Sequence, residues 1–484
     1  MNRASAAIVN GVLSLGPRVL PFADAATPEL PMARLLRLSL FQVTVGMAAV
    51  LLIGTLNRVM IVELSVPSWI VAGMLALPLL FAPLRTLVGY RSDNHRSVLG
   101  WRRVPFIWFG TMAQFGGFAI MPFALLILSG DTTGPVWVGQ AAAALAFLLV
   151  GAGLHTVQTV GLALATDLAP ERTRPRVVAL LCAMLLLGMA ASAGIFGLLL
   201  RHFSEVRLIQ VVQGAAVVTM VLNCAALWKQ EPRAFRRSTA PSQARGFAAS
   251  WNDFVSVAGA RRRLAATALG TAGFSMQDIL LEPYGGKILH LPVGATTALT
   301  AMLALGGGAG LMMAARRLNR GADPHRVAGL GALVGVVAFC CVIFAAPFES
   351  RILFASGVTL IGFGGGLFAH GTLTASMAVA KPEERGLALG AWGAAQATAA
   401  GLAIAFSGIV NDVGSTLAVR GVFGDAIAAP VTGYAIVYTV EILLLFAALV
   451  AIGPLIRSHE LRGLPAPGFT PAMAGDLRSG GLQS

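Results

Sequence analysis

Three side chains with acid and amide chemistry stand close together in an otherwise apolar stretch of the chain. The segment FSMQDILLEPYGG, residues 274–286, carries Gln277, Asp278 and Glu282 within six residues. A carboxylate surrounded by hydrocarbon is costly, so such groups usually pair, face a water-filled cavity or take part in function. The segment is therefore a candidate functional site.

The composition indicates a membrane protein with many spans. The 484 residues are 56% hydrophobic and 12% charged, and the mean hydropathy is +0.78. A soluble chain carries about twice that charged fraction. The net charge of +14 would suit nucleic acid, but Lys and Arg gather in alternate loops, which is a signature of membrane topology. We therefore expect a lipid membrane as partner and no nucleic acid.

Apolar segments long enough to cross about 30 Å of hydrocarbon recur along the whole chain. The predicted spans are residues 40–63, 67–88, 104–129, 139–166, 177–200, 208–228, 264–283, 294–315, 327–347, 353–379, 386–410 and 431–455. The fold class expected is an all-α polytopic membrane protein. The four cysteines lie within apolar runs, so we interpret them as small buried hydrophobes rather than as a disulfide framework or a metal site.

The basic residues follow the even-numbered spans, as Arg102 and Arg103 follow span 2 and Lys381 and Arg385 follow span 10. The loop at residues 129–134 on the opposite side has no Lys or Arg. The positive-inside rule then places both termini in the cytoplasm.

The two halves of the chain look like repeats of each other. GAGLHTVQTVGLALATDLAPER, residues 151–172, aligns without gaps on GGGLFAHGTLTASMAVAKPEER, residues 364–385, and GTLNRVMIVE, residues 54–63, aligns on GFSMQDILLE, residues 273–282. Two parallel halves of six spans describe the major facilitator architecture, with a site between the halves. The predicted parts are an N-terminal segment 1–38, a first half 39–228, a basic linker 229–263, a second half 264–456 and a disordered tail 457–484.

In the major facilitator fold, spans 1, 4, 7 and 10 line the central cavity, and the mid-span polar residues fall on these four spans. Arg58 and Asp278 stand at nearly matched repeat positions. We expect an ion pair between them across the interface of the halves, which would make both charges tolerable. The alternative is that the charges face water near the outer surface, where Glu63 and Glu282 are expected as interfacial acids close to the span ends. Glu441 of span 12 has no assigned role.

The loop GYRSDNHRSVLGWRRVP, residues 89–105, has the pattern of a cytoplasmic gate motif. In this motif a glycine allows close helix approach and an aspartate joins a charge network with clustered arginines. The residues that match the pattern are Gly89, Asp93, Arg96, Arg102 and Arg103. The alternative is an ordinary basic cytoplasmic loop.

Three long strings carry a resemblance that is more specific than the fold. LPFADAATPELPMARLLRLSLFQVTVGMAAVLLIGTLNRVMIVEL (20–64), RSDNHRSVLGWRRVPFIWFGT (91–111) and FSMQDILLEPYGGKIL (274–289) resemble the PucC/LhaA family of phototrophic bacteria. The resemblance covers nearly the whole chain, apart from the first dozen residues and the tail after Arg457. It implies an assembly factor that brings bacteriochlorophyll, and carotenoid as a further cargo, to light-harvesting antenna of the core (LH1) or peripheral (LH2) kind. The implied partners are the antenna α and β polypeptides, the reaction centre–antenna core complex and the enzymes of pigment synthesis.

A pigment of this kind needs an axial ligand for magnesium, donors for its ring carbonyls and an apolar slot. Imidazole is a common metal ligand, and amide oxygen suits magnesium. The pigment-binding candidates are therefore the intramembrane residues His155, His370, Asn57, Gln158 and Gln277. Glycines 151, 153 and 362–366 could admit a flat ring, or else they let helices pack closely.

Two other functions fit the same residues. A secondary transporter of an unknown solute, proton-coupled through Asp278 and Glu282, is the main alternative. A scaffold that binds antenna polypeptides without pigment is the second. We expect no enzyme, since no carboxylate–histidine set, nucleotide loop or thiol pair has catalytic spacing.

Overall fold

A computed structural model of the chain describes residues 26–27, 30–80, 88, 91–92, 101–130, 134–170, 173–231, 256, 259–379, 385–424 and 429–463. Most of the predicted N-terminal segment and basic linker, and the tail from residue 464, lie outside these residues. Gly89, Asp93 and Arg96 of the predicted gate motif lie outside them too. Within the described residues the regular structure is helical, without a strand.

The first six predicted spans are all present as helices. They are α2 (Met32–Ala49) with its continuations η2 (Val50–Leu56) and η3 (Val59–Glu63), α3 (Ser68–Leu80), α5 (Val104–Leu128), α6 (Val136–Leu168), α7 (Arg174–Leu199) and α8 (Glu205–Leu227). The continuations η2 and η3 are π-helical, so span 1 is wound more loosely over its second half than an α-helix.

The second six spans follow in the predicted order. They are α10 (Ala260–Ser275), which continues through the 3₁₀ turn η4 (Met276–Ile279) into α11 (Leu281–Lys287), then α12 (Val293–Asn319), α13 (Pro324–Ala345), α14 (Arg351–Val379), α15 (Arg385–Val419) and α16 (Val431–Gly463). Eleven helices of the described residues are long and apolar enough to cross a membrane, and residues 68–79 of α3 form a shorter apolar helix. The chain is therefore a multi-pass membrane protein.

Several helices extend past the predicted spans. Span 1 begins at Met32 rather than at residue 40, and span 11 continues to Val419 rather than to residue 410. Helix α16 also continues to Gly463, past the predicted start of the tail at residue 457. Hydropathy follows the hydrocarbon layer, whereas a helix can continue beyond that layer where packing or hydrogen bonds support it.

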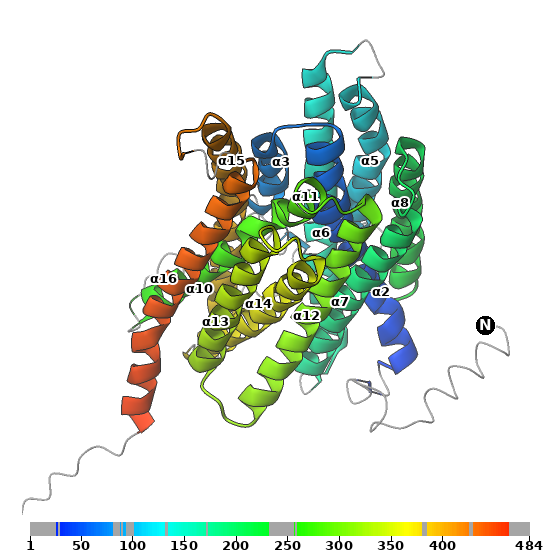
Figure 1. The fold of residues 1–484 in the computed structure, drawn as a ribbon. Helices are drawn as coiled ribbons and strands as arrows, with labels where there is room; N and C mark the ends of the chain where they lie inside the picture. The colour runs from blue at the N-terminus through cyan, green and yellow to red at the C-terminus, as the bar shows by residue number, and fades with distance from the viewer. Residues whose placement is uncertain are drawn as a thin grey trace, which may run out of the picture.

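The helices pack as two groups that meet along two pairs of helices. In the first group α2 packs against α6, α7 and α8, and in the second α10 packs against α14, α15 and α16. The groups are joined where α3 packs against α15 and α7 packs against α12. The beginning of α2 and the far end of α16 lie at the same end of the molecule (Figure 1).

Glycines make the contact between the two groups possible. A Cβ atom on Gly197 of α7 would lie 2.8 Å from the carbonyl oxygen of Gly294 in α12. A Cβ atom on Gly408 of α15 would lie 2.7 Å from the carbonyl oxygen of Ser68 in α3. Small residues let membrane helices approach backbone to backbone, so both joints depend on close packing.

Candidate functional site

Spans 1 and 7 cross between the two groups of helices at a cluster of polar side chains, which we call the polar seam. Most of its side chains are buried, while Asp278 is half-buried and Glu63 is exposed at its edge. It consists of Thr55, Asn57, Arg58, Glu63, Gln277, Asp278, Glu282, Thr297 and Thr300. Both spans depart from α-helical winding at the seam, span 1 through η2 and η3 and span 7 through η4. Irregular backbone at membrane depth is tolerated only inside protein or beside a water-filled cavity, and π-helical turns often occur at functional sites.

Hydrogen bonds from Asn57, Thr55 and Arg58 cross the seam from one half to the other. The side-chain amide of Asn57 donates to the carbonyl oxygen of Asp278 at 3.0 Å. The hydroxyl groups of Thr55 and Thr297 lie 3.3 Å apart. The Oδ1 atom of Asn57 and the Oε1 atom of Gln277 are buried and have no hydrogen-bond partner within the described part of the chain. Both amides therefore keep a free acceptor, as a ligand site would need.

Arg58 has a different partner from the one predicted. Its guanidinium group forms an ion pair with Glu63 of the same span and donates to the carbonyl oxygen of Leu291 at 2.9 Å. The predicted Arg58–Asp278 ion pair is wrong, because the π-helical turn places Glu63 beneath Arg58. Arg58 also contacts Gly286, where a Cβ atom would lie 2.9 Å from the guanidinium.

The two carboxylates of the opening motif are both held inside the second half. Glu282 is 4% exposed and accepts a hydrogen bond from the hydroxyl group of Thr300. It was expected at the membrane surface, but Gly54 leaves room for its carboxylate between spans 1 and 7. Asp278 accepts a hydrogen bond from the side-chain amide of Gln277.

The histidine candidates lie on helices of different halves. His155 and Gln158 are half-buried on α6, and His370 is half-buried on α14. The Nδ1 atom of His155 is buried and has no hydrogen-bond partner among the described residues. A ring nitrogen without a protein partner fits a metal ligand. The pigment-binding role of these residues stays a prediction.

The glycine-rich faces pack helices against each other at most of their positions. A Cβ atom on Gly362 of α14 would overlap the carbonyl oxygen of Leu303 in α12. A Cβ atom on Gly153 of α6 would lie 2.8 Å from the side chain of Gln114 in α5. Gly365 differs, because its nearest neighbour would be the ring of Phe274 at 3.8 Å. The close-packing interpretation therefore accounts for Gly153 and Gly362.

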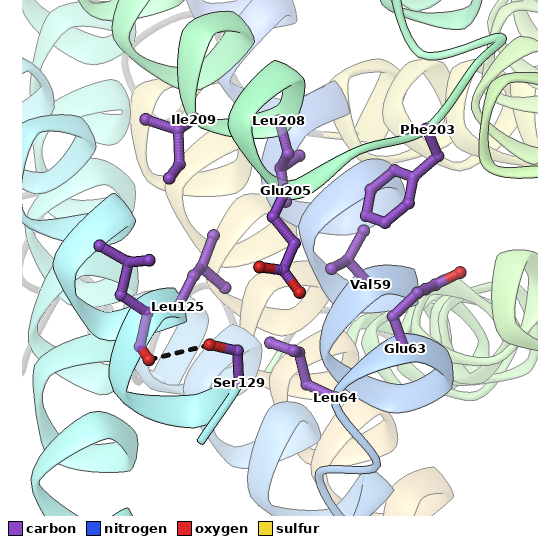
Figure 2. A pocket seen from close by; sticks show the side chains of 10 residues that line it. Val59, Glu63, Leu64, Leu125, Ser129, Phe203, Glu205, Leu208 and Ile209 are labelled. Carbon is purple, nitrogen blue, oxygen red and sulfur yellow. Dashed lines mark hydrogen bonds between the residues drawn. The ribbon is translucent and has the colours of Figure 1, made fainter. Parts of the chain in front are cut away.

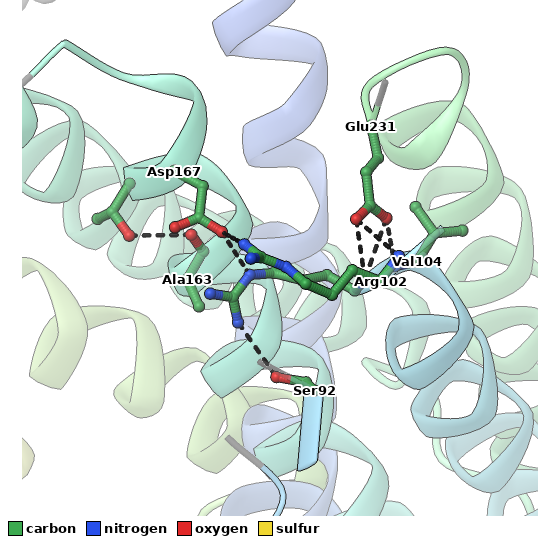
Figure 3. A network of polar contacts seen from close by, with 8 residues as sticks. Ser92, Arg102, Val104, Ala163, Asp167 and Glu231 are labelled. Atoms are coloured by element: carbon green, nitrogen blue, oxygen red, sulfur yellow. Dashed lines mark hydrogen bonds and ion pairs between the residues drawn. The ribbon is translucent and has the colours of Figure 1, made fainter. Parts of the chain in front are cut away.

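The described part of the predicted gate motif forms a charge network at the beginning of α5 (Figure 3). The side chains of Arg102 and Arg103 both pair with Asp167 at the end of α6, and Arg103 also donates to the hydroxyl group of Ser92 at 3.1 Å. The carboxylate of Glu231 accepts the backbone N–H groups of Arg102, Arg103 and residue 104, at 2.9 to 3.1 Å.

The two acids of this network have only weak signals in the sequence. Asp167 is an acid at the end of span 4, just before a basic loop, and Glu231 is an acid shortly after span 6. Neither has its partner nearby in the sequence, so both were missed.

A cavity of about 180 Å³ lies at the end of η3, between span 1 and the ends of α5 and α8 (Figure 2). The carboxylate of Glu205 points into it and Glu63 lines its edge, between apolar walls that include Phe203 and Leu125. The corresponding place of the second half is a wider groove of about 700 Å³ lined mostly by apolar residues, among them Ile288 and Val431. The two halves therefore have matching helices at this depth, but the lining of the cavity in the first half includes two acids, whereas the groove of the second half is lined mostly by apolar residues.

The twelve spans in two groups, joined at a buried seam between spans 1 and 7, define a major facilitator fold. Solved transporters share this fold. A bacterial homologue of the human lysosomal transporter Spinster, in an inward-facing, unoccupied conformation, superimposes with a TM-score of 0.65 at 14% identity, covering 90% of this chain and 98% of that one. A variant of the nucleoside transporter NupG gives 0.63 at 14% identity, covering 86% and 99%. Identities this low show the fold alone.

The chain belongs to the family described as PUCC protein, which it matches over residues 55–460. Protein PucC of Rhodovulum sulfidophilum is 56% identical over 420 residues, covering 85% of this chain and 92% of the relative. An uncharacterized protein in the puhA-bchM intergenic region of Rhodobacter capsulatus is 53% identical over 452 residues, covering 93% and 94%. A more distant relative is the bacteriochlorophyll synthase 44.5 kDa chain of Rhodobacter capsulatus, 28% identical over 432 residues and covering 87% and 95%.

Proposed function

We propose that the protein is an assembly factor for light-harvesting antenna, which binds bacteriochlorophyll in the membrane and delivers it to antenna α and β polypeptides. The observation that carries the proposal is the family match over residues 55–460, since this range contains every residue of the polar seam. A distant relative named as a chain of bacteriochlorophyll synthase supports a pigment as the cargo. Carotenoid is proposed as a further cargo.

Three described residues have the chemistry to hold the pigment. The unpartnered Nδ1 atom of His155 suits the axial position of magnesium. The free amide oxygens of Asn57 and Gln277 suit magnesium or a bridging water. His370 and Gln158 are the remaining candidates, on α14 and α6.

The proposed location is the bacterial inner membrane, with both termini in the cytoplasm. Arg102 and Arg103 at the beginning of α5, and Arg316 and Arg317 at the end of α12, belong to the basic ends of the spans. The positive-inside rule assigns such ends to the cytoplasm. The proposed partners are the antenna polypeptides, the reaction centre–antenna core complex and the enzymes of pigment synthesis.

The test is an absorption spectrum of the protein purified in mild detergent from a phototrophic host, freed of antenna polypeptides. We expect a stoichiometric, red-shifted bacteriochlorophyll band that weakens in His155→Ala or His370→Ala. His202→Ala is the matched control, because His202 is an exposed histidine in the loop before α8. A colourless, folded protein that still captures antenna polypeptides would replace the proposal with a scaffold.

A secondary transporter is the second candidate, since the solved neighbours are transporters and the Oε2 atom of Glu282 has no hydrogen-bond partner within the described residues. Its test is solute flux into proteoliposomes, which an assembly factor would not support. Family and fold favour a protein without catalytic activity, and we propose none.

A further inference from the structure

A second buried polar cluster lies inside the second half, on the side of η4 that faces α16. Glu441 of α16 is 0% exposed. Neither oxygen of its carboxyl group has a side-chain hydrogen-bond partner within the described residues, and the backbone N–H group of Gln277 in η4 lies close to it as a donor. The hydroxyl group of Tyr438 and the Oε1 atom of Gln277 are also buried and unpartnered there. We call Glu441, Tyr438, Gln277 and Asp278 the α16 cluster.

The α16 cluster has acids but no base. The titratable groups that face Glu441 are Asp278 from η4 and Tyr438 from its own helix. The ring of Tyr284 in α11 contacts the rings of Tyr438 and Tyr434. Asp412 of α15 lies close enough to Tyr434 to interact with it electrostatically.

The other helices packed around the α16 cluster add no titratable group at these contacts. Helix α10 places Gly273 against the backbone of Glu441. Helix α13 places the ring of Phe339 on Tyr438, with the ring centroids 6.2 Å apart. No Lys, Arg or His of the described residues forms an ion pair with Glu441.

We propose that Glu441 is an exchangeable proton-binding site, shared with Asp278, that couples proton binding to the contact between the two halves. An ionised carboxylate without a partner is very costly in an apolar interior, and binding a proton removes the charge. Two neighbouring carboxylates resist both being ionised at once. In the exchange a proton passes from hydronium to the Glu441 carboxylate, where an O–H bond forms, and the hydronium becomes a water molecule. The reverse step restores the carboxylate.

The coupling follows from the position of η4 between the α16 cluster and the polar seam. The side chain of Asp278 is bonded to Gln277 of the α16 cluster, while its carbonyl oxygen accepts the Asn57 amide from the first half at 3.0 Å. A charge change at Glu441 therefore acts on the short 3₁₀ turn whose backbone holds the other half. The inference goes beyond pigment delivery, since it does not depend on the identity of the cargo.

The first measurement is the infrared spectrum of the full-length protein in lipid nanodiscs as a function of pH. We expect a carbonyl band of a protonated carboxyl group that changes with pH and shifts in heavy water. The band should be lost in Glu441→Gln and kept in Glu349→Gln, the matched control, because Glu349 is exposed in the turn after α13. A band that Glu441→Gln leaves unchanged, or one that does not respond to pH, would overturn the proposal.

The second measurement follows the halves with spin labels at Leu168 and Met377, near the matching ends of α6 and α14. In the labelled protein without further substitution, we expect the distribution of label-to-label distances to change with pH. The same change is expected in labelled Glu349→Gln. Glu441→Gln should show the low-pH distance distribution at every pH, because glutamine mimics the neutral acid. Asp278→Asn should reduce the pH-dependent change in the distance distribution. An unaltered pH response in Glu441→Gln contradicts the coupling. A response to sodium at fixed pH would show a metal cation site instead of a proton site.

Discussion

Arg58 forms its ion pair with Glu63, five residues further along the same span. On an α-helix, residues five apart are about 140° apart around the axis and do not meet. The π-helical turn η3 has hydrogen bonds between residues five apart and is wound more loosely than an α-helix, and the N–H group of Leu64 donates to the carbonyl oxygen of Val59 at 3.0 Å in this pattern. The loose winding therefore pairs Arg58 within its own half, and Arg58 reaches the second half through the Leu291 carbonyl.

We expect Arg58→Gln and Glu63→Gln to be non-additive in a double-mutant cycle. Removing either partner leaves the other charge unpaired, so the second substitution should add little to the first. The coupling energy should be about 1–2 kcal/mol. Thermal unfolding of the four proteins in detergent measures it.

Arg58→Gln combined with Asp278→Asn is the control for that cycle, and their effects should add. A coupling energy between Arg58 and Asp278 as large as that between Arg58 and Glu63 would contradict this expectation and support the ion pair between the halves that the sequence predicted.

Gly362→Ala and Gly365→Ala should separate helix packing from pigment binding on α14. A Cβ atom on Gly362 overlaps the backbone of α12, so the variant should lose about 1–3 kcal/mol of stability. Gly365 has room, so Gly365→Ala should unfold like the parent protein. If Gly365→Ala nevertheless loses bound pigment at unchanged stability, the flat ring lies on this face.

The order and number of the spans were predictable, because a stretch that must cross hydrocarbon has to be apolar over its whole length. The helix ends were not. Arg34 and Arg37 interrupt the apolar pattern before residue 40, yet they are helical and donate to the carbonyl groups of residues 230 and 228. Asp412 lies past the predicted end of span 11, and it accepts the N–H group of Trp69 at 2.9 Å.

The polar residues of the site were predictable, but their partners were not. Polar residues within apolar spans stand out in the sequence, as Asn57, Arg58, Gln277 and Asp278 do. The sequence does not show which groups they form hydrogen bonds or ion pairs with. The partner of Arg58 depends on a π-helical turn, which leaves no trace in hydropathy. Glu441 was visible as a charged residue in span 12, but its isolation from any base required the packing of α16 against η4.

Arg103→Gln should destabilise the protein more than Arg102→Gln. Both side chains pair with Asp167, but the Arg103 side chain is 7% exposed and the Arg102 side chain 43%. Exposed ion pairs contribute about 0–1 kcal/mol, so Arg102→Gln should fall in that range. Arg103 also donates to the buried hydroxyl group of Ser92, and a hydrogen bond to a charged group contributes about 1.5–3 kcal/mol. Equal losses in thermal unfolding would show that burial of Arg103 does not matter.

Glu231→Gln should weaken the beginning of α5 by about 1 kcal/mol. The first N–H groups of a helix have no partner within the helix. Here the Glu231 carboxylate accepts the N–H groups of Val104, the first residue of α5, of the N-cap residue Arg103 and of Arg102 before it. A negative charge there also suits the helix dipole, whose effect salt screens. Thermal unfolding at low and high salt is the measurement, with Glu349→Gln as the exposed control. A loss that Glu349→Gln shares would trace the effect to net charge. A loss confined to Glu231→Gln and reduced by salt would show that this one carboxylate ties the end of span 6 to the beginning of span 3.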